Sequence, residues 1–439
     1  MKKYLFGLWR WFIPGLRVKR YLLLCLVGLV TLVLAFVAWA RVGPERNNFI
    51  NWTARLIEFS ESIGLGRWGL MGIGFFGGLL LGLLGIIGLN RSLLGAVGSS
   101  PTETLDMIFK RRGLARGPRL VAIGGGTGLS NLLGGLKAYT SNITAIVAVT
   151  DDGGSSGRLR AGLDMPAPGD LTDCYAALSD NPELKKLLTH RFSRGDIEGH
   201  TFGNLLLATL VEDRANFAEA TAAVNQILDV RGTVLPASLE SAVMLAHLED
   251  GTHIRGESVL ARERQGRKIR RISLEPADLT APIIALEAVQ NAELILLGPG
   301  SLYTSLTPPL LVQSLREAIQ KSKAKLVYIS NIMTEPGETD QMSLLEHVQV
   351  IVDHLGRNPD VVFVNSAKVL PALLENYQRS GAEPIKLDVA ALQTRGIAVI
   401  STTLTREGKA QHDPKRLARA LMTYAAKQRA KNPLSFYFE

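Results

Sequence analysis

Two long apolar stretches without a charged side chain lie near the start of the chain, at residues 21–40 and 68–89. About 20 helical residues rise about 30 Å, which is enough to cross a bilayer. A cleaved signal peptide or buried core helices are the alternatives. A signal peptide would have a shorter apolar region and a small-residue cleavage site, and here a second stretch follows the first. The pattern predicts a membrane region at residues 1–97 with two transmembrane helices.

Short β-branched runs alternate with longer amphipathic stretches from residue 119 onwards. This alternation predicts an α/β fold: a Rossmann-like, mostly parallel sheet with helices on both faces. The predicted strands are 120–123, 143–149, 294–297, 326–329, 361–364 and 397–400. The predicted helices lie near 129–139, 182–191, 203–211, 217–230, 311–322, 343–355 and 414–430. A hairpin pattern at 243–259, followed by an apolar run at 269–274, predicts a small antiparallel insertion at about 231–275.

A capping-box pattern at Ser100, Pro101 and Glu103 predicts a helix between the membrane region and the α/β domain. Glycines break the following stretch. We therefore expect a juxtamembrane helix and linker at residues 98–118 and one nucleotide-binding domain at residues 119–439.

The net charge of +9 belongs to the N-terminal part. Of the 49 lysines and arginines, 14 lie in residues 1–115 against five acidic residues, and the remaining 35 are balanced by 35 acidic residues. A neutral domain lacks the basic face that binds nucleic acid, so no nucleic-acid partner is expected. The basic residues flank the two apolar stretches. The positive-inside rule then predicts a multi-pass protein of the inner or plasma membrane, with both termini and the main domain in the cytoplasm.

Three glycines, Gly74, Gly78 and Gly82, recur every four residues in the second apolar stretch and mark one face of the helix. Such a face permits close packing against the first span or against another copy, which would give a homo-oligomer. The simple abundance of glycine in membrane helices is the alternative. The two cysteines, Cys25 and Cys174, predict neither a disulfide framework nor a metal cluster.

The first predicted strand runs directly into Gly124, Gly125, Gly126, Thr127 and Gly128, and a helix follows. Glycines allow the backbone to approach a phosphate, and a helix N-terminus offers unpaired N–H groups. The spacing matches neither a dinucleotide fingerprint nor a Walker loop. A tight turn without a ligand is the alternative reading.

The second predicted strand leads into an acidic and Gly/Ser-rich run. Two adjacent carboxylates suit a ribose, a Mg²⁺ ion or a basic group, and an arginine can clamp a phosphate. Magnesium is accordingly the one cofactor considered, with Asp151 and Asp152 as its ligands. The binding candidates in this run are Asp151, Asp152, Gly153, Ser155, Ser156 and Arg158.

Further candidates lie before helices and after the later strands. Asp170 and Asn204 could contact a ligand or simply cap a helix, and His200 is more easily read as structural than as an acid or base. Polar and glycine residues after the strands at 294–297 and 326–329 could hold a second phosphate or read a sugar. These are Gly298, Gly300, Ser301, Thr304, Asn331 and Thr334.

These loops, in this order, resemble the gluconeogenesis-factor (YvcK) family of the CofD-like superfamily. The resemblance covers about residues 119–365 and rests on 124–130, 151–160, 168–170, 199–206, 256–258, 298–305 and 331–339. It implies a cytoplasmic Rossmann-like domain that binds a uridine-diphosphate sugar. It also implies a role in cell shape and wall synthesis during growth on gluconeogenic carbon, without a firm catalytic reaction.

The sister family transfers 2-phospholactate from a guanosine pyrophosphate donor onto a deazaflavin, with magnesium. Its loop after the later strand resembles Gly-Pro-Ser-Asn-Pro, whereas this chain has Gly-Pro-Gly-Ser-Leu from Gly298. The chain also departs from the gluconeogenesis-factor pattern. Thr172 and Asp173 stand where Arg-Asn is usual, Glu335 where glutamine is usual, and Ala167 where proline is usual. The lost arginine and the added carboxylate disfavour an anion nearby.

Three hypotheses remain. The favoured one is a regulatory module that binds a nucleotide sugar at the membrane, because no convincing nucleophile or base accompanies the loops. A phospholactate transferase is the second. A membrane scaffold with a vestigial ligand loop is the third.

Overall fold

The structure is a computed structural model that describes residues 18–39, 66–95, 101–214 and 216–431, and single positions 55, 58, 59, 62 and 64. The chain divides into two compact units, residues 1–112 and residues 113–439. Helix α5 (Pro101–Ala115) spans the boundary between them. The predictions for residues 1–17 and for most of the loop at 40–65 lie outside the described residues.

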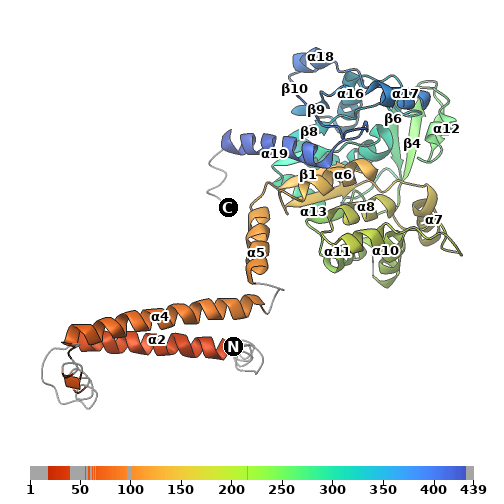
Figure 1. Cartoon of the computed structure of the whole chain (residues 1–439). Coiled ribbons are helices and arrows are strands. Elements are labelled where there is room, and N and C mark those ends of the chain that lie inside the picture. The colour runs from red at the N-terminus through yellow and green to blue at the C-terminus, as the bar shows by residue number, and fades with distance from the viewer. Residues whose placement is uncertain are drawn as a thin grey trace. The chain divides into compact units, whose positions relative to one another are not determined.

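Two long helices, α2 (Val18–Trp39) and α4 (Gly66–Gly95), form the first unit and lie side by side (Figure 1). Segments Lys19–Phe36 and Met71–Ser92 are long and apolar enough to cross a membrane, and 6% and 17% of these windows are buried. Most of their apolar surface is therefore exposed, unlike that of a soluble core helix. Two apolar helices that could span a membrane agree with the prediction.

Glycines bring the two helices into close contact. A methyl carbon placed on Gly28 would lie 2.7 Å from the Gly78 carbonyl oxygen, and one on Gly78 would lie 2.8 Å from the Gly28 carbonyl oxygen. One on Gly74 would lie 3.1 Å from Ala35, whereas one on Gly82 would meet nothing within 4 Å. The face predicted from Gly74 and Gly78 is thus used between the two helices of one chain. The homo-oligomer stays a prediction without support from this face.

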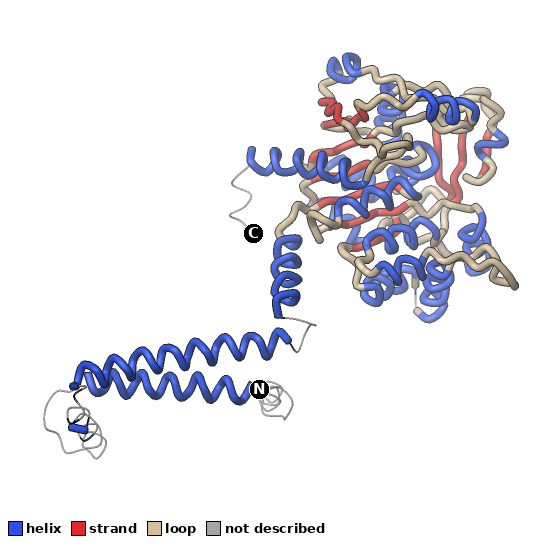
Figure 2. Tube along the Cα trace, viewed as in Figure 1, coloured by secondary structure: helices blue, strands red, loops and turns tan. Residues whose placement is uncertain are grey.

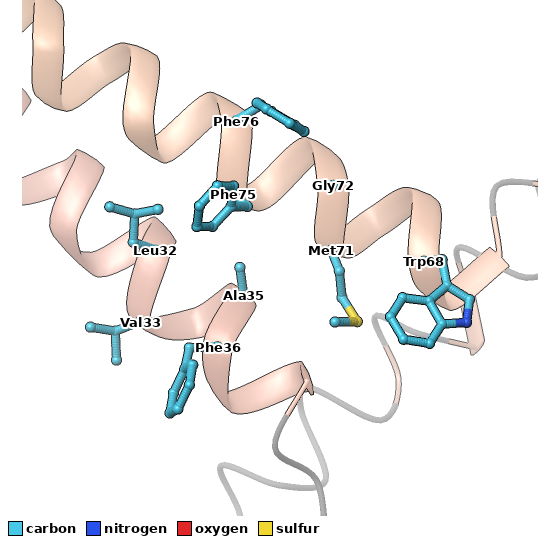
Figure 3. Close-up of a pocket in the computed structure, with 9 residues that line it drawn as sticks. All are labelled: Leu32, Val33, Ala35, Phe36, Trp68, Met71, Gly72, Phe75 and Phe76. Carbon is cyan, nitrogen blue, oxygen red and sulfur yellow. The ribbon is translucent and has the colours of Figure 1, made fainter.

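A groove of about 710 Å³ lies between the two helices near Trp68. Figure 3 shows the apolar side chains around it, with Phe36 from α2 and Met71 and Phe75 from α4. Its walls carry no charged side chain among the described residues. Such a surface suits a lipid environment better than water.

The second unit is built on a seven-stranded parallel sheet with the order β10-β9-β8-β7-β1-β2-β3. All six predicted strands are present in it, and the predicted Rossmann-like fold class is confirmed. The strands are β1 (Leu120–Gly124), β2 (Ile143–Val147), β3 (Thr233–Pro236), β7 (Leu294–Leu297), β8 (Lys325–Ile329), β9 (Val361–Asn365) and β10 (Ala398–Thr402).

Helices cover both faces of this sheet (Figure 2). Successive strand residues point to opposite faces, so Leu120 and Ala122 belong to one core cluster and Val121 and Ile123 to the other. The first face carries α6 (Gly126–Leu136), α7 (Gly154–Leu163), α8 (Gly169–Leu178), α9 (Pro182–Leu188), α10 (Phe202–Asp213), α11 (Phe217–Leu228) and α19 (Pro414–Lys431). The second carries α13 (Ile283–Asn291), α14 (Thr307–Leu311), α15 (Gln313–Lys321), α16 (Leu344–Leu355) and α18 (Val389–Thr394), with the π-helix η1 (Leu302–Leu306) before α14. Helix α17 (Pro371–Arg379) packs on a small third cluster.

The predicted antiparallel insertion is a three-stranded sheet of order β5-β4-β6. It comprises β4 (Val243–Leu248), β5 (His253–Arg255) and β6 (Ile269–Glu275), with α12 (Leu260–Glu263) between the last two. The expected start at about 231 needs correction, because β3 pairs parallel with β2 and belongs to the main sheet. The small sheet begins at Val243.

Two runs that the sequence suggested as loops are helical. Helix α7 begins at Gly154, within the run that follows β2, and η1 begins at Leu302, within the run that follows β7. The ligand candidates in these runs therefore lie at helix starts. All strands are parallel, but the strand order reverses between β1 and β7, and ligands of open α/β sheets bind at such a switch point.

Candidate functional site

A cavity of about 470 Å³ lies at the switch point, where the loops that follow β1, β7 and β8 meet. Seven of the predicted ligand residues line it: Gly125, Gly126, Thr127, Gly128, Gly300, Ser301 and Asn331. The other lining residues are Asn131, Pro299, Ser305, Ile332, Met333, Glu335, Tyr377, Ala410, Gln411 and His412.

The first wall is the glycine loop at the N-terminus of α6. Gly124 has φ 152° and Gly126 has φ 61°, which side chains with a Cβ atom rarely adopt. A methyl carbon on Gly128 would lie 2.0 Å from the Pro299 carbonyl oxygen, so only glycine lets this loop touch the loop after β7. The amides at the start of α6 suit an anion.

Asn331 ties the second wall to the third. Its Nδ2 donates to the Gly300 carbonyl at 2.8 Å, and its Oδ1 accepts from the Gly300 amide at 3.1 Å. The Ser301 hydroxyl donates to Glu335 Oε1 at 2.8 Å. Polar atoms at the ends of β7 and β8 are therefore fixed before any ligand arrives, as a binding site requires.

A buried carboxyl, Glu338, lies behind Glu335 and in hydrogen-bonding contact with it. Glu338 Oε1 accepts from the amides of Tyr303 at 2.6 Å and Thr304 at 2.9 Å. Burial, and next the charge of Glu335, raise the pKa of Glu338 to about 8. Below that pH Glu338 holds a proton.

The C-terminal part supplies a fourth wall that sequence reasoning missed. Tyr377 comes from α17, and Gln411 and His412 come from the segment between β10 and α19. Burial lowers the pKa of His412 to about 4, so its ring is neutral at pH 7. Its buried Nε2 has no hydrogen-bond partner within the described chain. Loops that follow parallel strands lie at one edge of the sheet, and this segment follows the predicted strand at 397–400. Its position beside the other loops could therefore have been predicted.

Asp170, at the start of α8, joins the cavity to a second group of predicted residues. It accepts a hydrogen bond from the Gly126 amide, and its Oδ2 leaves no room for a side chain on Gly125. Burial, and next the charge of Asp151, raise the pKa of Asp170 to about 7. Asp170 thus stabilises the conformation of the glycine loop.

The second group forms a hydrogen-bonded network around the start of α7. The Ser155 hydroxyl lies 2.9 Å from His200 Nδ1 and accepts from Asn204 Nδ2 at 3.0 Å. The Thr172 hydroxyl donates to Asn204 Oδ1 at 2.7 Å. Arg158 donates to the Glu198 carbonyl at 2.6 Å. His200, Asn204 and Arg158 therefore hold the protein's own loops together, and none lines the cavity.

The two adjacent carboxylates are also engaged locally. Asp151 Oδ1 accepts from the Gly153 amide at 2.9 Å, and Asp152 Oδ1 accepts from the Ser258 amide at 2.7 Å. Asp152 Oδ2 also lies tight against Gly256. No group of three or more His, Cys, Asp or Glu side chains within the described residues is arranged to hold a metal ion. Because Mg²⁺ is commonly held by only one or two carboxylates together with water and ligand phosphates, Asp151 and Asp152 as its ligands stay a prediction.

The remaining candidates shape the site without lining it. A methyl on Gly298 would lie 3.2 Å from the Ile123 carbonyl oxygen, and a Cβ on Gly169 would overlap the Ser156 hydroxyl. The Thr334 hydroxyl accepts from the Glu383 amide at 2.9 Å, which fixes the segment next to α17. The Thr304 amide supports Glu338. Among the departures noted above, the Asp173 side chain is exposed, although partial desolvation by its surroundings raises the pKa of its carboxyl.

Comparisons with known proteins identify the family of the chain. The family described as 2-phospho-L-lactate transferase CofD matches residues 120–405, which is most of the chain. The chain belongs to the CofD family. Within this CofD-family chain, the matched range covers the sheet and the glycine loops, and Gln411 and His412 lie beyond its end.

Relatives of this CofD-family protein carry the name gluconeogenesis factor. A relative from Deinococcus radiodurans is 47% identical over 417 residues, covering 94% of this chain and 88% of its own length. One from Bacillus subtilis is 41% identical over 310 residues, covering 70% of this chain and 97% of its own length. A crystal structure from Bacillus halodurans has a TM-score of 0.67 at 42% identity and covers 70% of this chain and 100% of that one. The resemblance stated from the sequence is confirmed.

Proposed function

We propose that this protein is a membrane-tethered binding protein for a nucleotide sugar of the uridine-diphosphate type. In this proposal it links the level of that sugar to cell shape and cell-wall synthesis during growth on gluconeogenic carbon. The observation that carries it is the meeting of the glycine loop, the Gly300–Ser301 loop and Asn331 at one cavity of about 470 Å³. That volume lies within the range of ordinary small-ligand pockets.

The chemistry of the cavity supports a phosphorylated ligand with polar groups at its other end. The amides at the start of α6 suit a phosphate, while Asn331, Ser301 and Glu335 offer acceptors and donors suited to hydroxyl groups. The relatives named gluconeogenesis factor support the cellular part of the proposal.

The membrane attachment rests on α2 and α4, with both termini and the second unit in the cytoplasm. The basic residues that flank the apolar stretches support this orientation.

Calorimetry of the full chain in lipid nanodiscs with UDP-glucose and UDP-N-acetylglucosamine tests the proposal. We expect saturable binding of at least one of these two nucleotide sugars. Absence of binding at millimolar sugar would reject it. Asp152→Ala and Gly128→Ala chains are compared in the same measurement. Only the methyl group of Gly128→Ala would enter the contact between the loops that follow β1 and β7.

A transferase is the second candidate, because the matched family is described as 2-phospho-L-lactate transferase CofD. In that reaction a hydroxyl oxygen of the deazaflavin attacks the phosphorus that bears lactate, the pyrophosphate P–O bond breaks, and GMP leaves with the electron pair. Incubation of the folded chain with the guanosine pyrophosphate donor, a deazaflavin and magnesium should then yield GMP. No GMP above a chain-free control would dismiss this candidate.

A further inference from the structure

Two electrically different kinds of group line the cavity. The first turn of α6 lies in one wall, where the Gly126 amide already donates to Asp170 and the N–H groups of Thr127 and Gly128 follow it. The carboxylate of Glu335 lies in the wall formed by the loop after β8. None of the described residues that line the cavity is a lysine or an arginine. An anionic ligand is therefore favoured near the first turn of α6 and opposed near Glu335.

The position of Glu335 is fixed by its neighbours. The Ser301 hydroxyl donates to its Oε1 at 2.8 Å. The buried Glu338 contacts it from behind and is itself held by two amide donors, those of Tyr303 and Thr304. A carboxylate anchored in this way has little freedom to move out of the cavity.

The buried Glu338 also supplies a hydrogen-bond donor to Glu335. Its raised pKa keeps a proton on the inner carboxyl at neutral pH, and that proton can be donated to Glu335. The outer carboxylate then presents acceptor oxygen to the cavity without a positive partner among the lining residues. Such an oxygen binds hydroxyl or amide N–H groups and repels phosphate.

We propose that Glu335 is the specificity-determining residue of this cavity, accepting hydrogen bonds from the hydroxyl groups of the ligand's sugar and rejecting ligands that end in a free phosphate. This inference rests on the proposed function. It predicts that the protein distinguishes a nucleotide sugar from the matching nucleoside diphosphate, whose terminal phosphate carries an additional negative charge.

The test measures the dissociation constants of UDP-glucose and UDP on the full chain in lipid nanodiscs. We expect the original chain to prefer UDP-glucose by about tenfold or more, the size of one hydrogen bond to a charged group. Glu335→Gln keeps the shape but removes the charge. It should weaken the binding of UDP-glucose and strengthen the binding of UDP, so that the preference for UDP-glucose falls below about twofold.

Two further variants complete the test. Ser301→Ala removes the hydroxyl that orients Glu335 and should lower the preference part of the way. Glu375→Gln, on the exposed side of α17, removes the same charge outside the cavity and should leave the preference unchanged. Circular dichroism on heating confirms that each chain is folded.

The outcomes separate the two proposals. If the original chain binds UDP-glucose and a folded Glu335→Gln chain keeps the same preference, the role of Glu335 is rejected and the proposed function stands. If the Glu335→Gln chain does not fold, the Ser301→Ala chain decides the question. An unchanged preference for UDP-glucose in that chain rejects the role of Glu335. If the original chain binds neither ligand, both proposals fall.

Discussion

Glu338 is the most deeply buried carboxyl of the candidate site, at 5% exposure. Its raised pKa has a cost for folding, because the unfolded chain would ionise this group near the ordinary glutamate pKa of 4.5 while the folded chain resists ionisation up to about 8. Between these values the unfolded state loses a proton that the folded state keeps. The stabilising contribution of the protonated group is complete below about 4.5 and is lost as the pH rises towards 8.

Glu338→Gln should remove this part of the pH dependence, because a glutamine keeps the acceptor for the two amides and cannot ionise. We expect the free energy of unfolding of the original chain to fall with pH in this window, by at most about 1.4 kcal/mol per pH unit from this group. The variant should show a flatter profile and be the more stable chain at pH 9. Urea unfolding followed by circular dichroism between pH 5 and pH 9 measures it, and two parallel profiles would contradict the assignment.

Some residues of the site could be predicted from the sequence, and the contacts of others could not. The glycines after β1 were predictable, because a strand, a glycine run and a helix in succession have few other uses. Asn331 and Ser301 could be placed at the same rim. The engagement of Arg158, His200 and Asn204 with the protein's own loops could not be predicted, since a polar side chain near a helix start reads the same whether it meets a ligand or a backbone carbonyl.

At the scale of elements, the buried strands were predicted because apolar β-branched runs of this length have few alternatives. Strand β3 was missed because it is four residues long, lies at the sheet edge and ends in Pro236. Helix α7 was missed because Gly154, Ser155, Ser156 and Gly157 give no apolar periodicity. Its helical state comes from tertiary contacts, which no local pattern reveals.

The pairing of α2 with α4 gives a prediction for the membrane unit. Gly78→Leu places a side chain against the Gly28 carbonyl oxygen, where a methyl carbon would already lie at 2.8 Å. We expect the two helices to separate and the midpoint of thermal unfolding in detergent to fall. Tryptophan fluorescence reports this unit selectively, because all five tryptophans lie in residues 1–112.

Gly77→Leu is the matched control, because a methyl carbon on Gly77 meets nothing within 4 Å. It adds the same side chain to the neighbouring position of the same helix and should leave the midpoint unchanged. An equal fall in both chains would show that leucine disturbs the helix itself, and the role of Gly78 in packing would be refuted.

At the scale of the whole molecule, the reversal of strand order between β1 and β7 determines where the loops meet. The alternation of strands and helices predicted a parallel sheet with its candidate residues at one edge, and the fold agrees. The strand order itself was not predicted, because neighbouring strands are chosen by packing between distant segments. For the same reason the wall formed by Tyr377, Gln411 and His412 was unforeseen.

The orientation in the membrane can be tested directly. The positive-inside rule predicts that a fluorescent protein fused to the C-terminus folds and emits in the cytoplasm. Alkaline phosphatase inserted after Ile50, between the two apolar stretches, should be active outside it. Activity from a phosphatase fused to the C-terminus would reverse the assignment.

The contact between Gly128 and Pro299 has a consequence for how this site can be altered. A methyl carbon on Gly128 would lie 2.0 Å from the Pro299 carbonyl oxygen, so the two loops are complementary in shape at this contact. A loop segment grafted from a relative must therefore be transferred together with the segment of the other loop that it contacts, because neither loop keeps its conformation beside a mismatched partner. We therefore expect the two segments to covary among relatives, although about 170 positions separate them along the chain.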